Sequence, residues 1–153
     1  MLLSLLYSYY LSRYDAKPDT MTQMVASQSE YLMEMINYES SLRLVEGESF
    51  IRFLVRDTQM GLIVEGCNSL SVIILFLSFI VAFKGSLLRT VIFILIGSVV
   101  IYLANLFRIV VLLVGFYEIP AHRGFLHSIV FPLIIYGMVF FMWMVWVTKF
   151  ARK

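Results

Sequence analysis

One cysteine occurs among the 153 residues, and polar residues surround it at the start of a long apolar run. Its neighbours form the sequence Glu65-Gly66-Cys67-Asn68-Ser69, and the apolar residues that follow continue to Phe83. A thiolate attacks a carbonyl carbon when a nearby group takes the proton of the thiol. A lone cysteine cannot form a disulfide within its chain, so Cys67 is either a packing residue or a nucleophile, and a two-cysteine redox enzyme is excluded.

Arg108 is the second residue that could do chemistry. It lies in the apolar segment 87–115, with its Cα about 10 Å from the end of that segment in a helix. At 100° per residue, one face of the helix carries four polar residues, Ser98, Tyr102, Asn105 and Arg108. A charge at this depth normally faces other protein groups, and a guanidinium can stabilise an oxyanion. The alternative, an arginine that reaches the lipid headgroups, leaves Asn105 without a hydrogen-bond partner.

His127 is the third residue that could do chemistry, and it lies at the start of the apolar segment 125–148. An imidazole beside a thiol can hold its proton and later deliver it to a leaving amine. The alternative for His127 is an interfacial anchor, and His122 in the preceding loop is expected to be solvated. Pro132 predicts a kink that opens space near the same end of the segment.

Together these residues are typical of a cysteine hydrolase or transferase. We expect three catalytic residues, namely Cys67 as nucleophile, Arg108 as oxyanion stabiliser and His127 as proton carrier. The amides of Asn68 and Asn105 could add hydrogen-bond donors. Glu65 could pair with the arginine or orient the histidine, or it could be an exposed residue at the membrane edge.

The composition indicates an integral membrane protein. Hydrophobic residues make up 61% of the chain and charged residues 14%, and the mean hydropathy is +0.88. The net charge of +2 is small and dispersed, which argues against nucleic acid as a partner. We expect neither a metal ion nor a cofactor.

The chain reads as a single membrane domain, residues 1–153. The largely apolar and aromatic segment 1–12 spans about 18 Å as a helix, too little for the roughly 30 Å of a hydrocarbon core. The predicted fold is an all-α membrane protein, a bundle of about four transmembrane helices of which the first is truncated or short. The bundle carries a small extracytoplasmic insert. The expected segments are a partial first span at 1–14, the insert at 15–62, and transmembrane helices at 63–83, 87–115 and 125–148.

The insert holds eight of the ten acidic residues, and its pattern predicts a helix and a hairpin. Asp19 or Thr20 can cap the helix, whose expected packing face consists of Met21, Met24, Val25, Gln28, Tyr31, Leu32, Met35 and Ile36. The β-rich segments 42–44 and 50–56 flank Gly47 and predict a β-hairpin. Residues 61–64 could add a third short strand that leads into the cysteine.

Basic residues predict the orientation of the bundle. Five of them fall on one side of the predicted spans, at Lys84, Arg89, Lys149, Arg152 and Lys153. By the positive-inside rule that side is cytoplasmic, which places the insert and Cys67 on the outer side.

The order of the polar blocks resembles the exosortase/archaeosortase family, and most of all the small exosortase F branch of Bacteroidetes. The resemblance covers residues 20–147, and three blocks carry it: Glu65-Gly66-Cys67-Asn68-Ser69-Leu70-Ser71, Asn105-Leu106-Phe107-Arg108, and the segment of residues 126–132 that contains His127. Members of this family are multi-pass inner-membrane cysteine proteases or transpeptidases. The resemblance implies the same three catalytic roles for the cysteine, the arginine and the histidine.

The resemblance also implies the partners and the location. The substrates would be exported proteins with a C-terminal sorting signal, a short motif followed by a membrane helix and basic residues. The site would face the periplasm from the bacterial inner membrane, and the small number of spans leaves room for a membrane partner subunit. The alternative is a non-catalytic membrane assembly protein in which Arg108 and Asn105 bind a partner helix. A serine protease is disfavoured because Gly97-Ser98 lacks a nucleophile motif around it.

Overall fold

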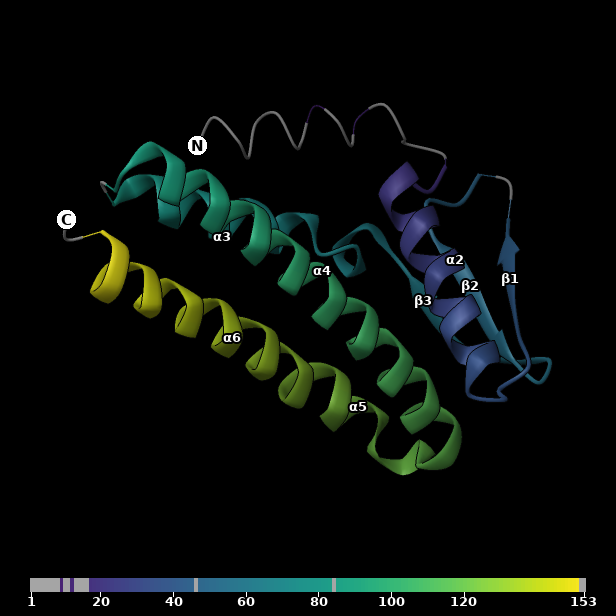
Figure 1. Ribbon diagram of the computed structural model, residues 1–153. Helices are drawn as coiled ribbons and strands as arrows, with labels where there is room; N and C mark the ends of the chain where they lie inside the picture. Colours follow the sequence, from purple (N-terminus) through teal and green to yellow (C-terminus); the bar gives the residue numbers. More distant parts are fainter. Residues whose placement is uncertain (1–8, 10–11, 13–16, 46, 84, 152–153) are drawn as a thin grey trace.

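The computed structural model describes residues 9, 12, 17–45, 47–83 and 85–151, without the side chain of Glu65. Three apolar helices, α3 (Leu70–Ala82), α4 (Leu87–Glu118) and α6 (Phe131–Val145), run alongside one another. Helix α2 (Thr20–Met35) and a three-stranded sheet form a small insert beside the C-terminal half of α4 (Figure 1). Most of the expected partial first span, residues 1–14, lies outside the described residues.

Helix α2 begins at the predicted cap. The carboxylate of Asp19 accepts hydrogen bonds from the backbone N–H groups of Met21 (2.9 Å) and Thr22 (3.2 Å), which satisfies free donors of the first turn. The predicted packing face is only partly correct. The fully buried side chains are Thr22, Val25, Ala26, Ser29 and Met33, while Met24, Tyr31, Met35 and Ile36 are exposed. The helix packs on a sheet, so its small and polar residues at helical spacing are buried and four of the expected apolar residues face away.

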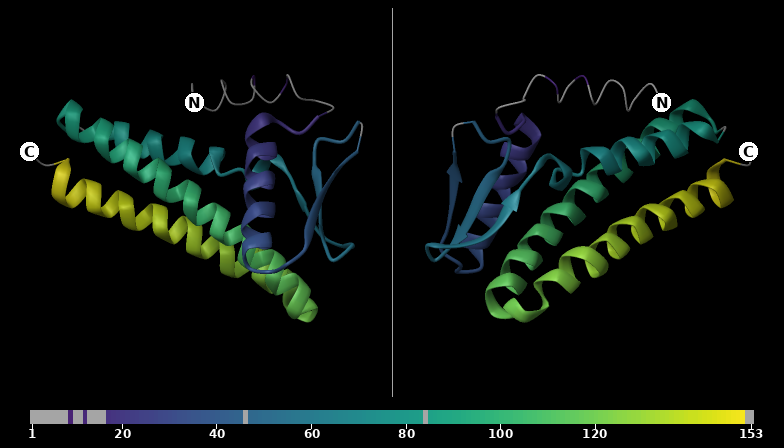
Figure 2. Two further views of the ribbon diagram at one scale, coloured as in Figure 1. Left: turned by 45° about the vertical axis from the view of Figure 1, so that its right-hand side comes forward. Right: turned by 180° about the vertical axis from the view of Figure 1, so that it is seen from behind.

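The predicted hairpin is present and extends to a third strand. Strands β1 (Ser40–Leu44), β2 (Ile51–Val55) and β3 (Thr58–Ile63) form an antiparallel sheet in that order, as the two views of Figure 2 show. Arg56 and Asp57 connect β2 and β3 with φ values of 46° and 60°, the left-handed conformation of a two-residue hairpin turn. Strand β3 is longer than expected, since it begins at this turn.

A short turn, η2 (Glu65–Cys67), joins β3 to α3, and the helix begins later than expected. Ser69 adopts φ 60°, and the side-chain oxygen of Asn68 accepts a hydrogen bond from the N–H of Leu70 at 3.1 Å. This local hydrogen bond competes with helical structure before residue 70. The 13 residues of α3 span about 20 Å, which is short of a bilayer core, so the predicted span at 63–83 is reduced to a shorter apolar helix.

Within the described residues, two helical stretches are long and apolar enough to cross a membrane. They are α4 and the continuous helical run Pro120–Phe150, which contains α6. Helices α3 and α4 approach closely at Gly97, where an added Cβ would collide with the ring of the fully buried Phe76. A buried cluster packs α3 against the N-terminal half of α4 and the C-terminal half of the last helix, and it consists of Phe76, Ile80, Ile101, Val139 and Trp146.

The helix that carries His127 has a wide turn near its start. Residues Leu126–Val130 form a π-helical turn, η4, between the single turn α5 (Arg123–Phe125) and α6. Pro132 follows this turn. Proline has no backbone N–H to donate, and its ring would clash with the carbonyl four residues earlier in a regular α-helix. The predicted disturbance near Pro132 is thus a widened turn that includes the histidine.

Candidate active site

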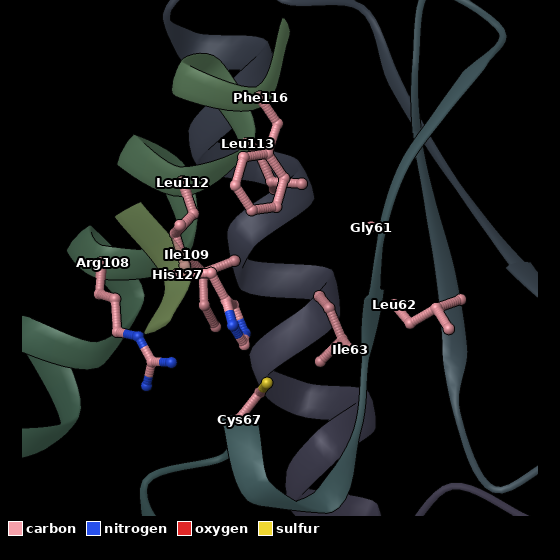
Figure 3. A pocket seen from close by; sticks show the side chains of 10 residues that line it. All are labelled: Gly61, Leu62, Ile63, Cys67, Arg108, Ile109, Leu112, Leu113, Phe116 and His127. Atoms are coloured by element: carbon pink, nitrogen blue, oxygen red, sulfur yellow. The ribbon is translucent and has the colours of Figure 1, made fainter. Parts of the chain in front are cut away.

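One pocket contains the three predicted catalytic residues. It has a volume of about 130 Å³ and lies between β3, the turn η2, α4 and η4. Cys67, Arg108 and His127 line it together with Gly61, Leu62, Ile63, Ile109, Leu112, Leu113 and Phe116. Figure 3 shows the Cys67 sulfur directed into the pocket towards the imidazole, with the guanidinium at the same end and the apolar side chains beyond. Three separate segments therefore bring a thiol, an imidazole and a guanidinium to one cavity.

Cys67 is held at its backbone on both sides. Its N–H donates to the carbonyl of Val64 at 2.8 Å, and its own carbonyl accepts a hydrogen bond from Nδ2 of Asn105 at 2.6 Å. Asn105 is only 2% exposed, so this bond is the partner that a polar side chain deep in α4 requires. Since the N–H of Cys67 is occupied, it is not available as an oxyanion donor.

Arg108 lies one turn after Asn105 and reaches the pocket that contains Cys67. Its Nε atom is buried and has no hydrogen-bond partner among the described residues. A buried unpaired donor of this kind costs about 1–3 kcal/mol, and more when it is charged. The guanidinium is therefore placed to gain strongly from an acceptor that enters the pocket.

His127 reaches the pocket from η4, and Arg123 fixes the segment before it. The guanidinium of Arg123 donates twice to the carbonyl of Phe116, at 3.0 Å from Nε and 2.7 Å from Nη2. This carbonyl belongs to the last turn of α4, whose acceptors lack helical partners. Arg123 thereby clamps the connection between the helix of Arg108 and the helix of His127.

The three reactive groups leave space between them. No hydrogen bond joins the thiol, the imidazole and the guanidinium within the described part of the structure. Across the described residues, no three His, Cys, Asp or Glu side chains gather in a way that could hold a metal ion.

Comparison with known proteins shows the family to which the chain belongs. The family model that describes the transmembrane exosortases matches residues 1–148. The chain belongs to the transmembrane exosortase family. It is therefore a membrane protein, in agreement with the two long apolar helices. No curated protein and no solved structure matches the chain.

One predicted supporting residue of this exosortase, Asn68, lies outside the pocket. Asn68 is completely buried, and its Nδ2 lies 3.3 Å from Oγ1 of Thr22 and 3.4 Å from the carboxylate of Asp19. Its amide therefore links the start of α3 to the cap of α2, and it does not line the pocket. The side chain of Glu65 lies outside the described residues.

A second link joins the insert of the exosortase to the end of α4. The hydroxyl of Tyr38 donates to Oε1 of Glu118 at 2.9 Å, and Arg56 donates to the hydroxyl of Tyr117 at 3.1 Å. The hydrogen bond to Glu118 raises the pKa of Tyr38 because it favours the protonated phenol. The guanidinium of Arg56 also lies over the Tyr117 ring, 5.4 Å from its centre. These contacts hold the sheet, and hence β3, against the helix that carries Arg108.

Sequence reasoning missed the residues that build the walls and the clamp. Spacing along α4 gave no reason to choose Leu112, Leu113 or Phe116 among many apolar residues. Arg123 had a usable signal, since a basic residue just after an apolar helix can bind its last carbonyls. The strand residues Gly61, Leu62 and Ile63 were expected only to lead towards the cysteine, but they form one side of the pocket.

Proposed function

We propose that this exosortase is a membrane-embedded cysteine peptidase or transpeptidase that cleaves C-terminal sorting signals from exported proteins. The observation that carries the proposal is the single pocket lined by Cys67, Arg108 and His127. The match to the transmembrane exosortase family supports it. These three groups are what an acyl transfer through a thioester needs.

The proposed reaction uses the three groups in turn. The imidazole of His127 takes the proton of Cys67, and the thiolate sulfur attacks the scissile carbonyl carbon. The negative charge that develops on the carbonyl oxygen is stabilised by the guanidinium of Arg108, whose Nε has no partner among the described residues. Collapse of the tetrahedral intermediate breaks the C–N bond, and His127 delivers its proton to the leaving amine.

The acyl group then remains on Cys67 as a thioester. Water or an acceptor amine attacks it, His127 takes the proton of that nucleophile, and the thiolate leaves. Hydrolysis releases the shortened protein, whereas an amine acceptor transfers it. The same three groups serve both steps, since each step forms an oxyanion at the same position.

The proposed setting is the bacterial inner membrane, with the pocket on the periplasmic side. Arg89 lies near the start of α4, and Lys149 lies near the end of the last helix, away from the insert. The other three basic residues of the predicted cytoplasmic side lie outside the described residues. The positive-inside rule and the family relationship support this orientation.

The test is processing of a natural substrate in membranes that contain Cys67→Ala, Cys67→Ser or the unchanged protein. We expect Cys67→Ala to accumulate normally and to abolish processing, and a protein fragment to be trapped as an acyl adduct on Cys67 of the unchanged enzyme. Processing that continues in Cys67→Ala would refute the proposal. If the chain were instead a non-catalytic assembly protein, Cys67→Ser would be silent and Arg108→Leu would break assembly.

A further inference from the structure

Strand β3 has one free edge, and this edge borders the pocket. The strand is last in the order β1-β2-β3 and pairs with β2 along one side only. Among the described residues, no strand pairs with its other side. Its last three residues, Gly61, Leu62 and Ile63, line the pocket that contains Cys67. Figure 3 shows the strand running along the pocket and down into the turn of the cysteine.

The register indicates which backbone groups point to this edge. Val55 and Thr58 close the two-residue turn and so form a hydrogen-bonded pair. Bonded and non-bonded pairs alternate along an antiparallel ladder, with the bulge beside Phe53 taken up by one extra residue of β3. Leu54–Gln59 and Arg52–Leu62 are then the non-bonded pairs. The N–H and C=O groups of Gln59 and Leu62 therefore point away from β2.

A free edge in this position calls for a partner. The unpaired N–H and C=O groups of an edge strand form a template on which another extended chain can pair. The opposite wall of the pocket is apolar, formed by Ile109, Leu112, Leu113 and Phe116 of α4. The volume of about 130 Å³ is close to the ~150 Å³ that can hold a benzene-sized apolar group. The pocket thus offers backbone pairing on one side and room for one apolar side chain on the other.

We propose that the free edge of β3 at Leu62 binds the substrate as an added strand. The substrate segment is an extended polypeptide, its backbone pairs with the N–H and C=O of Leu62, and one apolar side chain near the scissile bond enters the pocket. The edge continues through Ile63 into the turn of Cys67, so an extended chain paired with it is led to the sulfur. Backbone pairing supplies affinity, and the pocket supplies side-chain selectivity. This inference rests on the proposed function.

The test uses peptide probes on the full chain in membranes. The probe is an alkyne-tagged Ala-Ala-Leu chloromethyl ketone, which alkylates a thiol, and its matched versions carry an N-methyl group on each backbone amide in turn. In a paired strand only alternate N–H groups face the neighbouring strand. We expect one N-methyl group to slow labelling of Cys67 at least tenfold and the adjacent one to change it less than twofold. Equal rates of Cys67 labelling across the N-methylated probes would overturn the proposal.

The protein side of the test removes one edge donor. Leu62→Pro deletes an N–H that the ladder does not use, and Gln59→Pro deletes the equivalent N–H at the far end of the same edge, outside the pocket. We expect Leu62→Pro to slow labelling by the parent probe about tenfold while iodoacetamide still labels Cys67 at the normal rate. Gln59→Pro should label normally. Leu62→Ala keeps both backbone groups of the edge, so it should label at the normal rate and keep the N-methyl effect.

The outcomes separate this inference from the proposed function. A flat N-methyl series, or normal probe labelling of Leu62→Pro, overturns the edge proposal even when Cys67→Ala abolishes processing. Processing that persists in Cys67→Ala refutes the function itself. If Leu62→Pro converts a detergent-solubilised dimer to a monomer and leaves probe labelling unchanged, the edge belongs to a second copy of the chain and the proposal is wrong.

Discussion

The side-chain amide of Asn105 donates a hydrogen bond to the backbone carbonyl of Cys67 over 2.6 Å, between residues that are 38 positions apart. The bond ties the turn of the proposed nucleophile to the helix of Arg108. An asparagine three residues before the arginine lies on the same helix face, so one helix holds the backbone of the cysteine and presents the guanidinium. The relative position of thiol and guanidinium thus depends on Asn105.

Replacement of Asn105 by leucine is expected to lower substrate processing about 10- to 100-fold, because a shift of the reacting groups by about 1 Å has effects of this size. The measurement is the initial rate of processing, normalised to the amount of protein in the membrane. Tyr102→Phe is the matched control, since it removes a 2.8 Å hydrogen bond from the same helix to Gln28 and leaves the bond between Asn105 and Cys67 in place. Equal rates for Asn105→Leu and the unchanged protein would contradict a positioning role.

Arg123→Gln is expected to reduce processing about tenfold and to leave iodoacetamide labelling of Cys67 unchanged. The substitution removes the double hydrogen bond to the Phe116 carbonyl, which fixes the segment that carries His127. His122→Ala alters an exposed neighbour in the same connection and should process at the normal rate. A loss of labelling together with processing would show that the whole pocket, and not the histidine segment alone, depends on Arg123.

Gly97→Ala is expected to destabilise the bundle by about 1–3 kcal/mol, the usual cost of overpacking. The new methyl group meets the Phe76 ring, which is fully buried and cannot easily move. Melting temperature in detergent measures the effect, and Phe76→Leu in the same protein should recover part of the loss. Gly137→Ala on α6 is the control, because a Cβ there meets nothing within 4 Å. An unchanged melting temperature for Gly97→Ala would mean that α3 and α4 are not in close contact.

Glu30→Gln is expected to stabilise the insert at neutral pH. Burial raises the pKa of Glu30, the charge of Glu34 adds to the shift, and a hydrogen bond from the Leu42 backbone opposes it. A carboxyl group with a raised pKa contributes its full stability below the usual pKa of about 4.3 and loses it as the pH rises through the raised pKa. The gain in melting temperature from Glu30→Gln should therefore be small at acid pH and grow towards pH 7.

The exposed Glu39 offers the control for that experiment, because Glu39→Gln removes the same charge from the same insert. A gain from Glu30→Gln that is equal at both ends of the pH range, or one matched by Glu39→Gln, would show that local burial is not the cause.

The sequence predicted the elements of this fold well where a local rule applies. The cap at Asp19, the hairpin around Gly47 and the two long apolar helices all follow from residues close together in the chain. The predicted start of α3 was several residues too early, because the hydrogen bond from the N–H of Leu70 to the side-chain oxygen of Asn68 outweighs the apolar pattern. The packing face of α2 was partly wrong, because a sheet accepts small residues that hydropathy does not mark.

The lining of the pocket could be predicted only where a residue is chemically unusual for its surroundings. Cys67, Arg108 and His127 could be named from chemistry that is unusual in an apolar chain, and the structure places them around one pocket. The partner of Asn105 could not be named, because it is a backbone carbonyl, and every residue has one. Asn68 was expected near the chemistry, but its amide is taken up by Asp19 and Thr22, which lie more than 40 positions earlier.

The buried hydrogen bonds of Asn68 also limit how the insert of this protein can be exchanged. Its amide reaches the cap of α2, while the adjacent residue is the proposed nucleophile. A chimaera that exchanges residues 17–63 for the insert of a relative would separate this amide from the carboxylate and hydroxyl that receive it, and the cysteine turn would lose its support. In a successful chimaera, the Asp19–Thr22 segment and Asn68 therefore have to come from the same parent protein.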